Sequence, residues 1–163
     1  MLTVPNNLMS EMRAHGAAGY PHEVVGVMAG TYTRGEKTVT RLFRGANQFR
    51  LAEQSGGAAL EALREDLEVE GSSQNRFFMT GDEMRAIDAQ CRAEGIDIIG
   101  FYHTHPDHPA RPSVTDLHFA QQTLPGYSYV IMSVEQGTPG HTTCWVLNDE
   151  ETAFEEEGLR GQG

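Results

Sequence analysis

Cysteine is scarce in this chain of 163 residues, with copies only at Cys91 and Cys144. The two lie far apart and form no C-x-x-C pair, so the sequence predicts neither a disulfide framework nor a zinc site made of thiolates. Cys91 lies in a helical pattern and Cys144 in a strand pattern. Both side chains are therefore expected in the core, where a free cysteine acts as a small apolar residue.

Positive charge is also scarce. Twelve Lys and Arg stand against twenty-three Asp and Glu, which gives a formal net charge of -11, and no basic cluster concentrates positive potential. Nucleic acid is therefore not an expected partner. The acidic surface is interpreted first as a solvated surface that favours solubility, with attraction of a basic partner or adaptation to high salt as alternatives.

Long apolar runs are missing. No window approaches the roughly eighteen apolar residues that a membrane span needs, and Met1–Asn7 lacks the basic start and apolar stretch of a secretion signal. We therefore expect a cytoplasmic protein that does not enter a membrane. At 17.9 kDa the chain has room for one domain over residues 1–163, with a core at about 8–147 and an acidic, frayed tail at about 148–163.

The apolar patterns predict alternating helices and strands. A hairpin turn is expected at Arg34-Gly35, another turn over 136–140, and a helix stop at Gly95. Helices are expected at 6–19, from Thr80 to about Ala93, and at 113–122; strands are expected at 24–30, 37–43, 76–79, 96–102, 127–134 and 142–147.

Residues 48–74 differ in composition from the rest and are rich in Glu, Ala, Gly and Ser. A helix-prone centre carries Leu60, Leu63 and Leu67 as a narrow apolar stripe. The segment is either an inserted flap with a binding role or an acidic, solvated surface helix.

The most informative residues follow the strand expected at 96–102. His103 and His105 are two apart, so an extended backbone projects both imidazoles from one face. Pro106, Pro109 and Pro112 favour an ordered non-helical loop that returns a third ligand, Asp116, to the same ion. Two imidazoles and one carboxylate suit a catalytic zinc, because the fourth position stays open for water.

Ser113 and Asp116 also have a simpler interpretation as the capping residues of the helix that follows Pro112. Both roles are compatible, because a serine at a helix N-terminus also directs its hydroxyl toward the metal. His108 is placed at the rim of the site or in contact with substrate rather than among the ligands. Glu23 precedes a buried strand, where burial would raise the pKa of its carboxyl and suit a general base; a plain surface Glu is the alternative.

Taken together, these residues resemble the signature of the JAMM (MPN+) metalloproteases. That signature has a Glu ahead of a small apolar strand, then His-x-His-Pro, six residues, Ser, two residues and Asp, and this chain carries Glu23, His103 to Pro106, Ser113 and Asp116 at those offsets. The resemblance covers roughly 8–147 and points to the small stand-alone prokaryotic members. It implies a cytidine-deaminase-like α/β fold, in which a curved, mostly antiparallel sheet is flanked by helices.

The resemblance also implies a mechanism. One Zn²⁺ on His103, His105 and Asp116 would lower the pKa of its bound water toward about 7. Glu23 would take the proton as hydroxide attacks the carbonyl, and Ser113 would donate a hydrogen bond to the oxyanion.

Members of this family cleave after the C-terminal Gly-Gly of ubiquitin-like proteins, and small bacterial members resemble enzymes that trim sulfur-carrier proteins of that fold. The resemblance therefore implies a peptidase or isopeptidase with a ubiquitin-like or sulfur-carrier protein as its partner. The insertion at 48–74 resembles in position one that holds the ubiquitin-like partner in some deubiquitinases.

Two rival interpretations remain. A zinc deaminase would need Pro-Cys-x-x-Cys, which Cys91 and Cys144 do not provide. A non-catalytic MPN scaffold would lack one or more ligands, whereas this chain keeps them all together with Glu23 and Ser113. The oligomeric state stays open.

Overall fold

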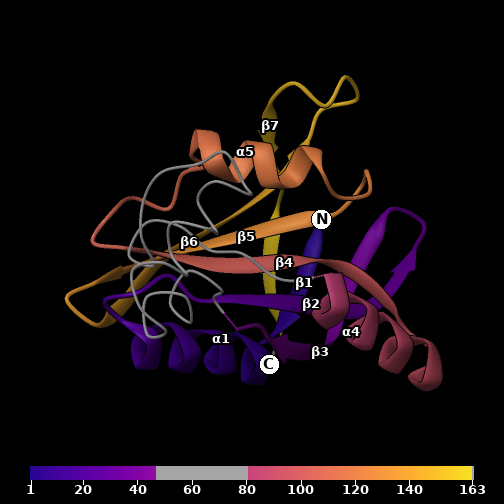
Figure 1. Ribbon diagram of the computed structural model, residues 1–163, viewed down its shortest axis with the longest axis horizontal. Helices are drawn as coiled ribbons and strands as arrows, with labels where there is room; N and C mark the ends of the chain where they lie inside the picture. Colours follow the sequence, from indigo (N-terminus) through magenta and orange to yellow (C-terminus); the bar gives the residue numbers. More distant parts are fainter. Residues whose placement is uncertain (47–80, 163) are drawn as a thin grey trace.

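The computed structural model describes residues 1–46 and 81–162. The expected insertion at 48–74 and the strand expected at 76–79 lie outside the described residues. In chain order the elements are β1 (Leu2–Pro5), α1 (Asn6–Gly19), β2 (Val25–Thr33), β3 (Glu36–Arg44), α4 (Gly81–Glu94), β4 (Asp97–Pro106), α5 (Val114–Gln121), β5 (Ser128–Glu135), β6 (Thr138–Leu147), β7 (Phe154–Glu156) and β8 (Leu159–Gln162) (Figure 1).

All of these strands belong to one sheet with the order β7-β6-β5-β4-β2-β3-β1-β8. The pairs β2–β3, β2–β4, β5–β6 and β6–β7 are antiparallel, whereas β1–β3, β1–β8 and β4–β5 are parallel. Antiparallel pairs are therefore the majority, and the expected α/β fold with helices on a curved sheet is confirmed. The two strands that carry the site, β2 and β4, lie side by side in the middle of this sheet.

The acidic tail is not frayed, and that expectation is wrong. β7 pairs with β6 at one edge of the sheet, and β8 pairs with β1 at the other, although only Glu157 and Gly158 separate them. The sheet must therefore curl until its two edges nearly meet. The Leu2 amide donates to the Gly158 carbonyl at 2.8 Å, and the Glu157 amide donates to Cys144 at 2.8 Å, so the connection bonds to both edges.

The expected core boundary at residue 8 is also too late, because β1 starts at Leu2. Leu2 and Val4 are fully buried, although a segment of four residues is too short to show strand periodicity. Its pairing partners, β3 and β8, are distant in sequence. The remaining expected helices and strands that lie in the described residues are present.

Two turns explain how the hairpins close. Arg34 and Gly35 both have positive φ, of 56° and 82°, as a two-residue hairpin turn requires. Gln136 and Gly137 also have positive φ, of 48° and 83°, and form the second two-residue turn. The turn expected over 136–140 is therefore shorter than predicted, and Thr138 already belongs to β6.

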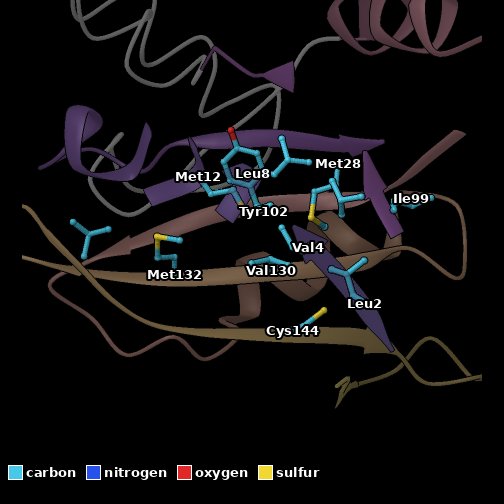
Figure 2. Close-up of a cluster of buried hydrophobic side chains, with 12 residues drawn as sticks. Leu2, Val4, Leu8, Met12, Met28, Ile99, Tyr102, Val130, Met132 and Cys144 are labelled. Carbon is cyan, nitrogen blue, oxygen red and sulfur yellow. The ribbon is translucent and has the colours of Figure 1, made fainter. Parts of the chain in front are cut away.

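Apolar side chains form a separate cluster on each face of the sheet. The first cluster packs α1 against the sheet through Leu8 and Met12, with Tyr102 of β4 in the same group (Figure 2). The second cluster packs α4 and α5 against the opposite face through Ile87, Cys91 and Ala120. Burial of Cys91 and of Cys144 confirms the core position expected for both. None of the described helices is long and apolar enough to cross a membrane.

Candidate metal centre

Strand β4 extends past the expected end at Tyr102 and carries both histidines itself. His103 and His105 therefore project from one face of a buried central strand, as their spacing predicts. Both are buried, with 2% and 7% of their surface exposed. A strand held on both sides by β2 and β5 gives these imidazoles a rigid support.

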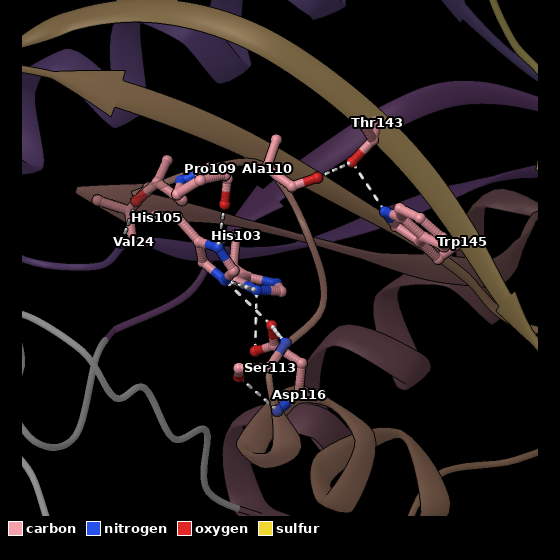
Figure 3. Close-up of polar contacts among 10 residues, drawn as sticks. Val24, His103, His105, Pro109, Ala110, Ser113, Asp116, Thr143 and Trp145 are labelled. Carbon is pink, nitrogen blue, oxygen red and sulfur yellow. Dashed lines mark hydrogen bonds and ion pairs between the residues drawn. The ribbon is translucent and has the colours of Figure 1, made fainter. Parts of the chain in front are cut away.

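Asp116 reaches the histidines from the first turn of α5. Ser113 is the N-cap of this helix, and its hydroxyl oxygen accepts from the Asp116 amide at 3.1 Å. In return, the Ser113 amide donates to Asp116 Oδ2 at 2.8 Å. This reciprocal capping box fixes the carboxylate, so the same two hydrogen bonds cap α5 and orient Asp116 in the site (Figure 3).

The three side chains converge closely enough to hold a metal ion. Asp116 Oδ1 lies 3.0 Å from His103 Nε2, and Asp116 Oδ2 lies 3.0 Å from His105 Nε2. The two Nε2 atoms are 3.2 Å apart. One nitrogen from each ring and one carboxylate oxygen all lie within 4.8 Å of one another.

The hydrogen bonds around His105 show why this set fits a cation. His105 Nδ1 lies 2.8 Å from the Pro109 carbonyl, which can only accept, so Nδ1 must carry a proton. In the neutral ring, Nε2 then presents a lone pair toward Asp116 and His103. Such converging acceptors are satisfied by an added proton or by a metal ion. A hydrogen bond from Nδ1 to a backbone carbonyl is typical of metal-binding histidines.

The pKa values of these groups reflect the same convergence. Burial disfavours the charged form of His105, but the hydrogen bond and charge of Asp116 outweigh it and raise the pKa of His105. Burial likewise opposes ionisation of Asp116, yet the two histidines hold the pKa of its carboxyl far below the usual value. The carboxylate is thus ionised and ready to act as a ligand.

Strand β2 brings Glu23 to the same place. Val25 is paired with His103, and the chain stays paired beyond it, because Thr104 N–H donates to the Val24 carbonyl at 3.1 Å. The Val24 amide donates in turn to the Thr104 hydroxyl at 2.9 Å. Glu23 is the next residue before Val24, and it is 6% exposed.

A cleft of about 320 Å³ opens beside the three converging side chains. It is lined by the sequence-predicted Glu23, His105 and Ser113 and also by His108. The lining residues are Glu23, His105, His108, Pro109, Arg111, Pro112 and Ser113. No sequence pattern indicated Arg111 as part of the site.

The loop between β4 and α5 is held by bonds that sequence reasoning missed. Thr143 donates its hydroxyl to the Ala110 carbonyl at 2.7 Å and accepts from Trp145 Nε1 at 2.8 Å (Figure 3). Ser133 donates to the His108 carbonyl at 2.7 Å. These partners come from β5 and β6, more than twenty residues away in sequence, so no local pattern could indicate them.

The remaining histidines do not join this group. His15 lies on α1, and its Nδ1 is 2.7 Å from the Tyr102 hydroxyl on the other face of the sheet. Burial, with help from Arg44, lowers the pKa of His15 to about 4. His118 is exposed and contacts Gln122, and His141 is exposed on β6.

The chain matches the model of a family described as prokaryotic homologs of the JAB domain over residues 5–148. It is 27% identical over 136 residues to a desampylase of Haloferax volcanii, a match that covers 83% of this chain and 80% of that protein.

Solved structures agree on the fold. A protein of Salinibacter ruber is 36% identical to this chain and superposes with a TM-score of 0.67. The match covers 99% of this chain and 91% of the Salinibacter chain. A JAB1/MPN domain protein of Archaeoglobus fulgidus is 13% identical and superposes with a TM-score of 0.56. The match covers 100% of this chain and 98% of the Archaeoglobus chain. At that identity it supports the fold alone.

Proposed function

Because this chain belongs to the family of prokaryotic homologs of the JAB domain, we propose that it is a zinc-dependent peptidase or isopeptidase. The relationship predicted from the Glu, His-x-His, Ser and Asp pattern is thereby confirmed, whereas the reaction itself is our proposal. The observation that carries it is the convergence of His103, His105 and Asp116 beside a cleft that also contains Glu23 and Ser113.

In this proposal His103, His105 and Asp116 hold one Zn²⁺. Two imidazoles and one carboxylate leave a coordination position open, which is the pattern of catalytic rather than structural zinc. The ion would supply Lewis acidity, lowering the pKa of a water and polarising the scissile carbonyl. Asp116 is kept ionised by the two histidines and is oriented by Ser113 in the helix cap.

Glu23 is the proposed general base. Its carboxylate accepts a proton from the attacking water, so that hydroxide adds to the acyl carbon of the scissile bond. It then returns the proton to the departing nitrogen, which leaves as an amine while the acyl half leaves as a carboxylate. Placement in the same cleft as His105 supports this role, because the hydrogen bonds between Val24 and Thr104 hold the chain next to Glu23 against β4.

Ser113 is proposed to stabilise the oxyanion that forms on the substrate. Its oxygen already accepts from the Asp116 amide, which leaves the hydroxyl hydrogen available for donation. Since Ser113 lines the cleft, that hydrogen is directed by the same cap that positions Asp116. Removal of such a donor from other enzymes costs about 10²–10³ in rate.

The proposed substrate is the C-terminal Gly-Gly tail of a ubiquitin-like or sulfur-carrier protein. The support is the similarity to a desampylase, at an identity that leaves the individual carrier open. A non-catalytic scaffold is the alternative. The retention of three converging ligands with Glu23 and Ser113 favours the enzyme over it.

The test combines metal analysis with cleavage. Purified protein should carry near-stoichiometric zinc, and it should release an extension from a ubiquitin-like carrier lengthened beyond Gly-Gly, followed by intact mass. Glu23→Gln should keep the zinc and lose activity by about 10²–10⁴-fold. Glu150→Gln, an exposed carboxylate far along the chain, is the matched control. A wild type that is stable without metal and inactive would favour the scaffold.

A further inference from the structure

We propose that Arg111 binds a free carboxylate on the leaving side of the scissile bond. The enzyme would then favour a short C-terminal extension, joined to Gly-Gly through an α-amino group, over an isopeptide bond to a lysine side chain. This inference rests on the proposed function and names the substrate class of the same cleft.

The position of Arg111 is fixed by its loop. It lines the cleft together with Glu23, His105 and Ser113. Its backbone N–H donates to the Pro109 carbonyl at 2.8 Å, and the preceding carbonyl, of Ala110, accepts from Thr143. Pro109 also accepts from His105, so the loop that orients a proposed zinc ligand carries the guanidinium as well.

The guanidinium is available to a ligand. Arg41, Arg85 and Arg92 each form an ion pair with a carboxylate. Within residues 1–46 and 81–162, no ion pair or side-chain hydrogen bond engages Arg111, which is exposed. In a chain with a net charge of -11, an exposed arginine that lines a cleft and forms no ion pair with another described residue is suited to bind an anion.

The chemistry of the substrate decides which anion could reach the Arg111 guanidinium. The acyl side of the scissile bond is Gly-Gly and carries no side-chain charge. On the leaving side, a residue joined through its α-amino group has one carbon between the scissile nitrogen and its carboxylate. A lysine joined through its side chain holds its own α-carbon at the far end of a long aliphatic stem, where neighbouring peptide bonds remove the carboxylate.

The size of the cleft agrees with a small leaving group. Its volume of about 320 Å³ is at the lower end of the range of roughly 300–1,000 Å³ for small-molecule sites. A planar guanidinium binds a carboxylate through two parallel hydrogen bonds, which gives orientation as well as affinity. Arg111 would therefore align the scissile nitrogen with Glu23, the proposed proton donor.

The test uses two fluorescent synthetic peptides that end in Gly-Gly-Ala, one as the free acid and one as the carboxamide. A third probe joins the same Gly-Gly to the side-chain amine of a lysine amide. Cleavage by the zinc-loaded wild type should favour the acid over the amide by about tenfold in kcat/KM, as expected for one charge-assisted contact. In Arg111→Ala the acid-to-amide ratio should fall to about one.

Two further variants sharpen the readout. Arg111→Lys keeps the charge but loses the paired geometry, so an intermediate ratio is expected. Arg92→Ala removes an arginine that is exposed on α4 and paired with Asp88, and it should leave the ratio unchanged. Binding of the acid and amide peptides to zinc-loaded Glu23→Gln gives a second readout that does not depend on turnover.

Equal cleavage and equal binding of acid and amide by the wild type would overturn the role of Arg111. An equal loss for both peptides in Arg111→Ala would also overturn it. Cleavage of all three probes without an acid preference would leave the proposed hydrolase standing while this inference fails. Tighter binding of the acid by Glu23→Gln, lost in Glu23→Gln/Arg111→Ala, would support the carboxylate site even if no probe were cleaved. No binding and no cleavage would reject both proposals.

Discussion

Two buried polar clusters in this molecule solve the same electrostatic problem in different ways. At the closure of the sheet, Lys37 Nζ lies 3.6 Å from Glu157 Oε1, and the side chains are 9% and 10% exposed. Ser128 bridges them, accepting from Lys37 at 2.8 Å and donating to Glu157 at 2.6 Å. At the candidate metal centre, one carboxylate and two imidazoles converge from β4 and α5.

The difference lies in where the cation comes from. The closure cluster carries its own cation in Lys37, so its charges are compensated within the chain. The candidate metal centre presents a carboxylate and ring nitrogens, and their charge must be compensated by a proton or an ion taken from solution. A buried acidic group costs free energy unless it is paired. The first cluster is therefore suited to closing the fold, and the second to binding a cation.

The largest expected effect is the loss of the proposed metal and of activity in Asp116→Asn. The substitution keeps the size of the side chain and removes the charge that both histidines face. We expect zinc content to fall below detection by elemental analysis, and activity to fall by more than the roughly 10–100-fold that loss of a supporting partner costs. Asp149→Asn, exposed beyond β6, is the control. Full zinc and activity in Asp116→Asn would remove it from the ligand set.

The closure cluster should instead affect stability. Glu157→Gln leaves the buried Lys37 without its carboxylate, so the free energy of unfolding should fall by about 3–5 kcal/mol in denaturant titration. Glu156→Gln, the exposed neighbour, should change it little. The double variant Lys37→Met/Glu157→Leu should recover part of the loss, because both charges are removed. A double variant no more stable than Glu157→Gln would argue against the pair as the origin of the effect.

The smallest expected effect is a pH dependence of stability that differs between chelator-treated and zinc-loaded protein. The folded pKa of His105 is raised above its unfolded value of 6.5 by Asp116. In chelator-treated protein, this contribution to stability is fully present below pH 6.5 and is lost as pH rises through the folded pKa. Zinc-loaded protein should show the opposite trend, because protons compete with the metal for His105.

Thermal unfolding at several pH values above 6.5, with and without chelator, measures this contrast. That range avoids His15, whose pKa of about 4 makes it destabilising only as pH falls below 6.5. Parallel curves in the two samples would show that protons and metal do not share the site.

Much of the candidate site could be predicted from sequence because its parts are set by short-range geometry. His103 and His105 need only an extended backbone to face the same way, and Ser113 and Asp116 need only the first turn of a helix. The distant member, Glu23, was a candidate base from its place ahead of a buried strand, but eighty residues separate it from His103, and only the resemblance favoured it over a plain surface Glu. Arg111 and Thr143 were not predicted, because their roles depend on which strands lie beside the loop.

The sequence by itself determined the local pieces: the two histidines on a strand, the capped helix with its carboxylate, the hairpin turns and the acidic surface. Each of these depends on residues within a turn or a strand of one another. The tertiary structure decided the rest. Only when the sheet curls do β7 and β8 occupy opposite edges and bring Glu157 to Lys37. Only the pairing of β2 with β4 places Glu23 beside the histidines, because long-range pairing is set by burial of whole faces rather than by local pattern.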